Sequence, residues 1–391
     1  MVAWRRTGRR GRWLAGAAVV AVLAAAGVII GVTASHRVVT LDEKHCGGGW
    51  AGPVAGHQSL TLRDAAPNPV QVYLIDPSRD LVYAEARDLT PGSRRAIDTT
   101  LGAGRYALRC VFTDGTVLTS PAHTLTGKVP GAVTGVKPMP DLDLGDPVTA
   151  YRTYVRDGLP GLLRDATRLA ADVTSGDLTA AKRDWLPAHL DYERLGAAYN
   201  SFEDFDAEIN GLADGLPEGV ADPSWTGFHR IEYGLWHGQP AATLKPLTDG
   251  LVADIDGLIQ DFASEDIDPG DLPLRTHEIL ENSLEFQVSG HADYGSGTTL
   301  ATTYANTQGT QAVLGTLTSL ITARNPALRA AIDAGLKTVQ ADLLACRDAG
   351  GSWTAATALP LPQRQRLDAD LDGLLERLDV VPNLLYERTA A

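Results

Sequence analysis

The chain has 391 residues, enough for two domains of ordinary size, and its 44% hydrophobic and 21% charged content argues against a disordered protein. Its formal net charge is −14, and the first 34 residues hold five arginines and no acid, so the rest of the chain is more acidic still. Such a composition argues against a nucleic acid partner and suits cations, although surplus carboxylates also serve solubility.

The N-terminal segment 1–35 predicts export from the cytoplasm. After its arginines, residues 13–34 (WLAGAAVVAVLAAAGVIIGVTA) carry no charged side chain. About 20 apolar residues span a bilayer, and the basic side stays in the cytoplasm. Val32, Thr33 and Ala34 also fit a cleavage site, so a transmembrane anchor and a signal peptide are both open. Either way, the chain after residue 35 is expected in the cell envelope, outside the cytoplasm.

Residues 38–127 alternate between apolar and polar side chains, as half-buried strands do. The segments SLTLRDA, VQVYLID, LVYAEARDL and RYALRCVF are separated by turns that contain Pro, Gly and Asp. They predict a small all-β sandwich. Cys46 and Cys110 lie in this region, whereas Cys346 lies far away on a helical pattern. Because an exported chain favours disulfides, we expect a bond between Cys46 and Cys110 and one leftover thiol.

The second half of the chain has a helical period. Residues 128–147 are rich in Gly and Pro and predict a linker. From 148 to 389, apolar residues recur every three or four positions, as in LKPLTDGLVADIDGLIQDF. This pattern predicts an all-α helical bundle of about seven or eight helices.

The stretch WTGFHRIEYGLWHG, residues 225–238, holds the first candidate metal ligands. His229 and Glu232 are three positions apart, so on a helix they share one face and can hold one cation. His237 lies farther round the helix and is a weaker candidate. The aromatic side chains of the stretch are interpreted as packing.

Two ligands do not make a site, so the others must come from a neighbouring helix, for which segment 185–210 is the candidate. A carboxylate beside an apolar stripe is costly unless a cation or a donor compensates it. We therefore take Glu193 as the third ligand and Asp204 as the fourth, with Asp206 as the alternative to Asp204. An ion pair of Glu193 with Arg194, or a cap by an aspartate, is the competing interpretation.

Two further patterns are weaker. His277 and Glu281 also share a helix face, but such pairs are common on solvated helices. A zincin peptidase needs the run H-E-x-x-H, whereas Arg230 follows His229 here. The residues favour cation binding over hydrolysis.

The motifs resemble a known family. DPSWTGFHRIEYGLW, DYERLGAAYNSFEDFD and TTYANTQGTQ are similar to the imelysin-like domain, which is classed with peptidases by its H-x-x-E motif. The order of β-sandwich, linker and helical domain, with LTPGSRRAIDTTLGAGRYALRC in the first half, resembles the components of Efe-type iron uptake systems that begin with a cupredoxin-like domain. This resemblance covers about residues 38–389.

The resemblance implies an imelysin-like bundle that binds iron, as Fe²⁺ or Fe³⁺, or another divalent cation such as zinc. His229 and Glu232 would hold it with carboxylates of the preceding helix. The resemblance also implies two partners, an iron permease in the membrane and a haem peroxidase. The family usually has a histidine directly before the Tyr-Glu-Arg run, where this chain has Asp191. Asp191 is still a hard oxygen donor, so the metal preference is open.

The β region departs from a blue-copper protein, which needs two His, a Cys and usually a Met close together. His123 is the nearest histidine after Cys110, and Met139 lies in the linker. We therefore expect no copper electron-transfer site there, but a domain held by its disulfide. A weaker metal site that uses His45 and Glu85, with the cysteines if they are reduced, is the alternative.

Together with this resemblance, the sequence predicts an exported iron-binding protein, anchored to the membrane or secreted, that passes its cation to a permease without covalent chemistry. Two alternatives are a metallopeptidase of the imelysin type and a metal-dependent binding protein for an acidic polymer. For the last, the net charge of −14 is a handicap unless a cation bridges the two.

Overall fold

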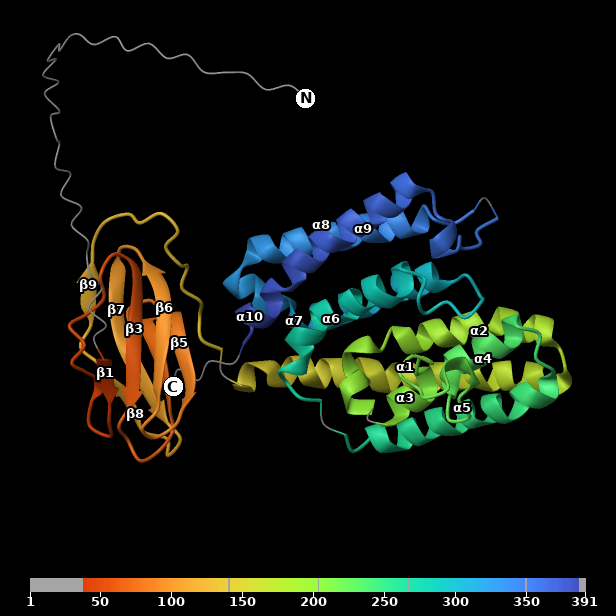
Figure 1. Cartoon of the computed structure of the whole chain (residues 1–391), viewed down its shortest axis with the longest axis horizontal. Helices are drawn as coiled ribbons and strands as arrows, with labels where there is room; N and C mark the ends of the chain where they lie inside the picture. Colours follow the sequence, from red (N-terminus) through yellow and green to blue (C-terminus); the bar gives the residue numbers. More distant parts are fainter. Residues whose placement is uncertain (1–37, 140, 203, 266, 349, 387–391) are drawn as a thin grey trace, which may run out of the picture. The chain divides into compact units, whose positions relative to one another are not determined.

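The computed structural model describes residues 38–386 except 140, 203, 266 and 349, and it contains a β region followed by a helical region (Figure 1). The predicted anchor or signal segment 1–35 lies outside the described residues. Within the described part of the chain, none of the helices has the length and apolar character needed to cross a bilayer.

The β region consists of two sheets that share one core. Its strands are β1 (Val38–Leu41), β2 (Cys46–Gly48), β3 (Gly56–Asp64), β4 (Val70–Asp76), β5 (Leu81–Leu89), β6 (Arg94–Leu101), β7 (Gly104–Phe112), β8 (Val117–Thr119) and β9 (His123–Leu125). One sheet has the order β2-β1-β3-β6 and the other β5-β4-β7-β8, with β9 also paired to β7. β1 runs parallel to β3, and the other strand pairs are antiparallel. Leu62 of the first sheet and Val72 and Leu108 of the second are fully buried in the shared core, as alternating strands of a sandwich require.

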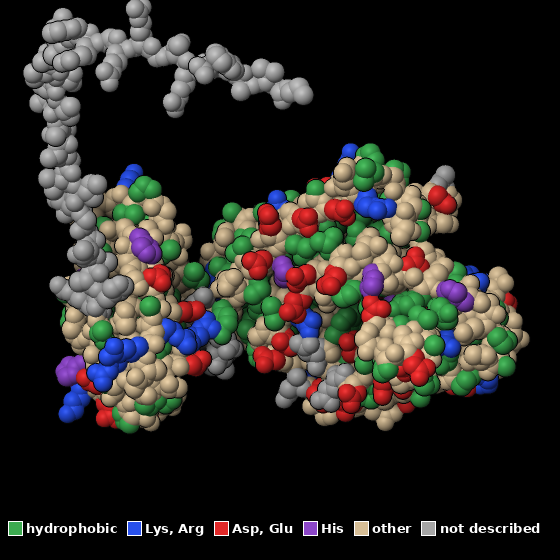
Figure 2. Space-filling view, in the orientation of Figure 1, with side chains coloured by type: hydrophobic (Ala, Val, Ile, Leu, Met, Phe, Trp, Pro, Cys, Tyr) green, Lys and Arg blue, Asp and Glu red, His purple; other side chains and the backbone are tan. Residues whose placement is uncertain are grey.

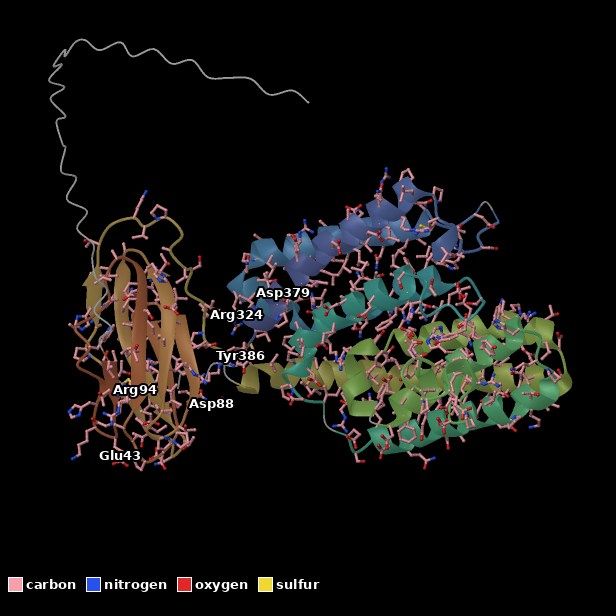
Figure 3. All side chains as sticks on the ribbon, viewed as in Figure 1. Glu43, Asp88, Arg94, Arg324, Asp379 and Tyr386 are labelled. Atoms are coloured by element: carbon pink, nitrogen blue, oxygen red, sulfur yellow. A yellow bond between two sulfur atoms is a disulfide. The ribbon has the colours of Figure 1, made fainter. Side chains whose placement is uncertain are left out.

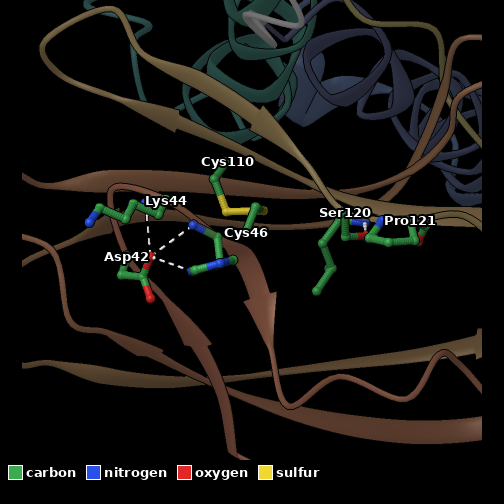
Figure 4. The surroundings of a disulfide bond; sticks show 8 residues. Asp42, Lys44, Cys46, Cys110, Ser120 and Pro121 are labelled. Carbon is green, nitrogen blue, oxygen red and sulfur yellow. Dashed lines mark hydrogen bonds and ion pairs between the residues drawn. A yellow bond between two sulfur atoms is a disulfide. The ribbon is translucent and has the colours of Figure 1, made fainter.

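A disulfide joins the two sheets. It links Cys46, at the start of β2, to Cys110 on β7, as the sequence predicts (Figure 4). Beside it, the Asp42 carboxylate accepts hydrogen bonds from the backbone N–H groups of Lys44 and His45, both at 2.8 Å, which fixes the turn that leads into β2. The remaining cysteine, Cys346, is a buried free thiol.

Loss of this disulfide is expected to destabilise the β region. The bond closes a loop with a sequence separation of 64. Chain-entropy reasoning for a loop of that size gives a stabilisation of about 4 kcal/mol. We expect the variant Cys46→Ser/Cys110→Ser to lose about this much, measured by denaturant unfolding of the full chain with hydrogen exchange of the β4 and β7 amides.

Cys346→Ser is the matched control for that variant. The Cys346 thiol donates to the Asp342 carbonyl and accepts from the Gln363 amide, both at 3.3 Å, and a serine hydroxyl is able to keep both bonds. Its expected cost is about 1 kcal/mol. Equal stability of the two variants would contradict a structural role for the disulfide.

The helical region begins with a short 3₁₀ turn, Asp141–Leu144, and runs to residue 384. Its α-helices are α1 (Gly145–Ser175), α2 (Leu178–Glu193), α3 (Asp204–Asn210), α4 (Gly227–Trp236), α5 (Ala241–Phe262), α6 (Asp271–Asn282), α7 (Thr299–Arg324), α8 (Pro326–Leu344), α9 (Leu361–Leu378) and α10 (Val380–Leu384). Further 3₁₀ segments are Gly196–Phe202, Gly219–Ala221 and Ala356–Ala358, and Ser283–Val288 is a π-helix. α1 starts inside the predicted linker because Pro147, in its first turn, is compatible with a helix start.

The described residues form ten α-helices, more than the seven or eight expected, and one reason is that segment 185–210 is not one continuous helix. α2 ends at Glu193, and a 3₁₀ segment leads to α3. The buried hydroxyl of Tyr151 stabilises this break, since it donates to the Leu195 carbonyl and accepts from the Ala197 N–H, both at 3.1 Å.

The predicted apolar faces pack the helices together. α1 contacts α2 and α5, α7 contacts α6 and α8, and α8 contacts α9 (Figure 1). Leu251, Ile255 and Leu258 of α5 are almost fully buried in the helical core. Side chains fill the spaces between the ribbons (Figure 3). Acidic side chains are spread over the visible face of the helical region, in line with the net charge of −14 (Figure 2).

Candidate metal centre

Helices α2 and α4 bring three potential metal ligands together. His189 and Glu193 lie one turn apart at the end of α2, and His229 lies on α4. One ligand atom from each of them lies within 4.8 Å of the others. Across residues 38–386, leaving aside the four gaps, this is the only group of three or more His, Cys, Asp or Glu side chains arranged to hold a metal ion. The site is therefore built between two helices.

The three side chains are buried and are held by one polar neighbour. His189, Glu193 and His229 are 1%, 3% and 2% exposed. His189 Nε2 lies 3.0 Å from Glu193 Oε1 and 3.1 Å from Asn210 Oδ1, and Asn210 Nδ2 donates to Glu193 Oε1 at 2.9 Å. Charged groups are expensive to bury unless they are paired. This network therefore compensates the burial of the Glu193 carboxylate, a charged potential metal ligand.

Packing and a hydrogen bond fix α2 against α4. The Trp185 indole N–H donates to the Phe228 carbonyl at 3.0 Å, which ties the two helices together one residue before His229. The Trp185 ring also lies against the His189 ring, with ring centres 4.8 Å apart. The aromatic residues therefore set the separation of the two imidazoles, whose ring centres are 5.1 Å apart.

A glycine allows α4 to start where it does. Gly227 has a φ of +80°, and a β-carbon there would lie 2.3 Å from the Ile209 carbonyl oxygen at the end of α3. The Thr226 hydroxyl donates to the Glu208 carbonyl at 3.0 Å and adds to the same contact. Only glycine tolerates both the left-handed backbone and the close approach. This close contact between α3 and the start of α4 positions His229 beside α2.

Glu232 lies on the same helix as His229, as predicted, but the structure does not place it within the three-residue group. Its Oε1 accepts from the backbone N–H groups of Tyr294 and Ser296, at 3.2 and 3.0 Å, and its Oε2 lies 3.4 Å from His229 Nδ1. Both oxygens therefore have protein partners. Through these contacts Glu232 links His229 to the loop 289–298.

The local environment keeps both carboxylates ionised. Burial alone would raise the pKa of Glu193, but the hydrogen bond and charge of His189, helped by Asn210, lower it below its ordinary value. Burial likewise acts to raise the pKa of Glu232, and the interactions with His229 and Ser296 lower it. At neutral pH each carboxylate is therefore ionised, and its oxygens are able to bind a metal ion or to accept hydrogen bonds.

The structure separates the two aspartates that were considered as further ligands. Asp204 is exposed at the first position of α3 and does not reach the cluster. Asp206 lines a cavity beside Glu193 and His229 and accepts a hydrogen bond from the Tyr192 hydroxyl at 2.6 Å. Two positions on a helix are about 200° apart, so only one of the pair is able to face inward. Burial raises the pKa of Asp206, and the Tyr192 hydroxyl partly offsets this.

Several other predicted donors lie outside the cluster. Asp191 forms an ion pair with Arg194 at 2.7 Å. His237 is exposed, and its Nδ1 lies 2.8 Å from the Tyr233 carbonyl oxygen. His277 Nδ1 lies 3.5 Å from Glu281 Oε2 on α6, and the side chain of Glu281 is 58% exposed.

The structure does not bring His45 and Glu85 together. His45 lies in the exposed turn before β2, where its Nδ1 is 3.1 Å from Asp42 Oδ1. Glu85 belongs to β5 of the other sheet and forms an ion pair with Arg87 at 2.6 Å. The cysteines proposed to help them are joined in the disulfide, so they offer no thiolate.

His189 was not among the predicted ligands. It lies four positions before Glu193, the same spacing that singled out His277 and Glu281, so the signal was present. The family resemblance predicts a histidine directly before Tyr192, where this chain has Asp191. In the structure His189, one helical turn before Glu193, supplies the imidazole on α2.

Comparison with known proteins assigns the helical region to a family. A family model for imelysin, classed as peptidase family M75, matches residues 147–381. Because that match covers more than half of the chain, the chain belongs to the imelysin family.

More specifically, the chain is similar to proteins named iron uptake system component EfeO. It is 26% identical over 316 residues to the one from Escherichia coli O157:H7, covering 81% of this chain and 82% of that protein. With the same coverage, it is 25% identical to those from Escherichia coli K12 and Shigella flexneri.

Proposed function

We propose that this protein is the extracytoplasmic component of an iron uptake system, which binds iron in its helical region and delivers it to a membrane permease. The observation that carries the proposal is the buried group of His189, Glu193 and His229. Two imidazoles and one carboxylate that leave coordination positions open are the donor set of non-haem Fe²⁺ sites. The names of the relatives support the choice of iron as cargo.

The neighbours of the three residues suit this role. His229 Nδ1 faces Glu232, so its Nε2 is left for the cation, an arrangement that metal-binding histidines commonly use. Glu193 is ionised at neutral pH, as a ligand must be. The same donors also suit Zn²⁺, which we expect to compete with Fe²⁺ in vitro.

The rest of the chain is assigned by the same proposal. The N-terminal segment 1–35 serves as a membrane anchor or a signal peptide, and the protein works in the cell envelope with an iron permease and a haem peroxidase. The two-sheet region is a cupredoxin-like domain that serves in docking or electron handling. Its disulfide leaves Cys46 and Cys110 without a thiolate for a copper site.

A peptidase is less well supported by the site. The carboxylate nearest to His229 belongs to Glu232, and its Oε1 already accepts two backbone N–H groups. A general base must be able to take a proton from the attacking water. The hydrogen-bond partners of Glu232 are instead those of a residue that stabilises the geometry of the site.

Anaerobic titration of the full chain with Fe²⁺ tests the proposal. His229→Ala is expected to weaken Fe²⁺ binding by at least about 100-fold, because it removes one of three protein donors. His237→Ala, on the same helix but exposed, is the matched control and is expected to bind as the wild type does. Wild-type affinity in His229→Ala would refute the site, and peptide cleavage that this variant loses would favour the peptidase.

A further inference from the structure

A cavity of about 190 Å³ adjoins the three candidate ligands. Glu193, Asp206 and His229 line it. Residues of α6, the π-helix and α7 line it as well, among them Arg275, Gln287 and Asn306. A single water molecule needs only about 10–15 Å³ of cavity volume, so this cavity has room for much more than an ion and one water.

Two buried acceptors in the lining have no hydrogen-bond donor among the residues that the structure describes. They are Asn306 Oδ1 and Gln287 Oε1, on residues that are 4% and 9% exposed. Leaving such an atom unsatisfied costs about 1–3 kcal/mol. Because both residues line the cavity, an occupant of the cavity is able to supply the missing donors. Gln287 is part of a π-helix, an irregularity that frequently marks functional sites.

The orientation of the Asn306 amide follows from its neighbours. The Ser283 hydroxyl donates its only hydrogen to the Ile279 carbonyl at 2.8 Å, so it must accept the second bond that it makes, at 3.0 Å, from Asn306 Nδ2. Asn306 Oδ1 is then the amide atom that is left to accept a hydrogen bond from an occupant of the cavity. α7 is held close to the end of α2, because a β-carbon at Gly309 would lie 2.8 Å from the Arg194 carbonyl oxygen.

A guanidinium group gives the same cavity a positive charge. Arg275 lines the cavity, pairs with Glu278 at 3.0 Å, and its side chain is only 13% exposed. Burial raises the pKa of Asp206, which also lines the cavity, and the charge of Arg275 acts in the opposite direction. Guanidinium is suited to planar carboxylates. The cavity therefore offers acceptors for hydroxyl groups and a partner for a carboxylate.

We propose that this cavity binds a small hydroxycarboxylate together with the iron, so that the cation is held as a ternary complex of protein, iron and chelator. The inference rests on the proposed iron site of His189, Glu193 and His229. Oxygens of the hydroxycarboxylate fill coordination positions that the three protein donors leave open. Its hydroxyl hydrogen satisfies Asn306 or Gln287, and a further carboxylate pairs with Arg275.

Citrate is the probe for this proposal, and tricarballylate, which lacks the hydroxyl group, is its matched control. The full chain is incubated anaerobically with Fe²⁺ and radiolabelled citrate and then separated by gel filtration. We expect about one citrate per protein to be retained with iron and none without it. Retention of labelled tricarballylate is expected to be at least about tenfold weaker, since one good hydrogen bond to a charged or buried partner is worth that much.

Two variants separate the chelator subsite from the iron site. Gln287→Leu and Arg275→Gln are expected to bind Fe²⁺ alone within about twofold of the wild type but to retain at least about tenfold less citrate. Gln287→Leu replaces an unsatisfied amide with an apolar group of similar size, so folding is expected to survive.

The outcomes distinguish this proposal from the one on which it rests. If citrate removes iron from the wild type and is not retained, the chelator subsite is refuted while the iron site stands. A second iron equivalent that displaces citrate from the cavity would also refute it. If Fe²⁺ alone does not bind, the proposed function fails first, and retention of citrate without iron would likewise contradict the ternary complex.

Discussion

Replacement of His189 and Glu193 together by alanine is expected to abolish measurable Fe²⁺ binding. These residues supply two of the three donors that lie within 4.8 Å of one another, and His229 alone cannot hold a cation against water. The expected result is a loss of affinity beyond the range of an anaerobic titration, with bound iron quantified after gel filtration as a second measurement.

The chain contains a matched control for this variant. His277 and Glu281 have the same spacing on α6, and the His277 ring lies 3.5 Å from the Glu281 carboxylate. The variant His277→Ala/Glu281→Ala is expected to bind iron as the wild type does, because the pair is outside the cluster. Glu193→Gln, which keeps the size of the side chain, checks that any loss is not caused by misfolding. Unchanged binding in His189→Ala/Glu193→Ala would show that the ligands lie elsewhere.

Gly227→Ala is expected to have the second large effect, on stability and iron binding together. Its β-carbon would lie 2.3 Å from the Ile209 carbonyl oxygen and 2.6 Å from that of Glu208, and both are backbone atoms that move only if α3 and α4 separate. The left-handed φ of +80° adds about 1–2 kcal/mol of strain, and the overlap adds about 1–3 kcal/mol. Denaturant unfolding is expected to show a loss of about 2–5 kcal/mol.

Gly238→Ala separates the contribution of backbone strain from that of the steric overlap. Gly238 follows the same helix with a φ of +73°, but a β-carbon there meets nothing within 4 Å. This variant is expected to lose only the strain of about 1–2 kcal/mol and to bind iron normally. Gly227→Ala is expected to weaken iron binding as well, because a shift of α4 moves His229 away from α2. Similar behaviour of the two variants would contradict the close contact of α3 with α4.

The division of the chain into an all-β and an all-α part was predictable from the sequence, because each follows from local periodicity. Alternation of apolar residues marks strands, and recurrence every three or four residues marks helices. The Cys46–Cys110 bond was predictable because the third cysteine lies in the other region. Likewise, the spacing of three positions was enough to predict that His229 and Glu232 share one face of a helix, and both lie on α4.

The break after α2 was harder to predict. The segment around Tyr199 keeps an apolar pattern, so a continuous helix looked favourable. The break depends on the hydroxyl of Tyr151, a residue more than 40 positions away in the chain. A local pattern carries no information about a partner so distant.

The sequence by itself determined which segments are strands and helices, the cysteine pair, and a histidine and a glutamate on one helical turn. Only the tertiary structure decided that His189 and Glu193 meet His229, that Glu232 turns to the loop 289–298, and that Asn306 faces the same cavity. The physical reason is that spacing along a helix sets which side chains share a face. Distances between helices depend instead on contacts such as Trp185 with Phe228 and Gly227 with Ile209, which packing alone creates.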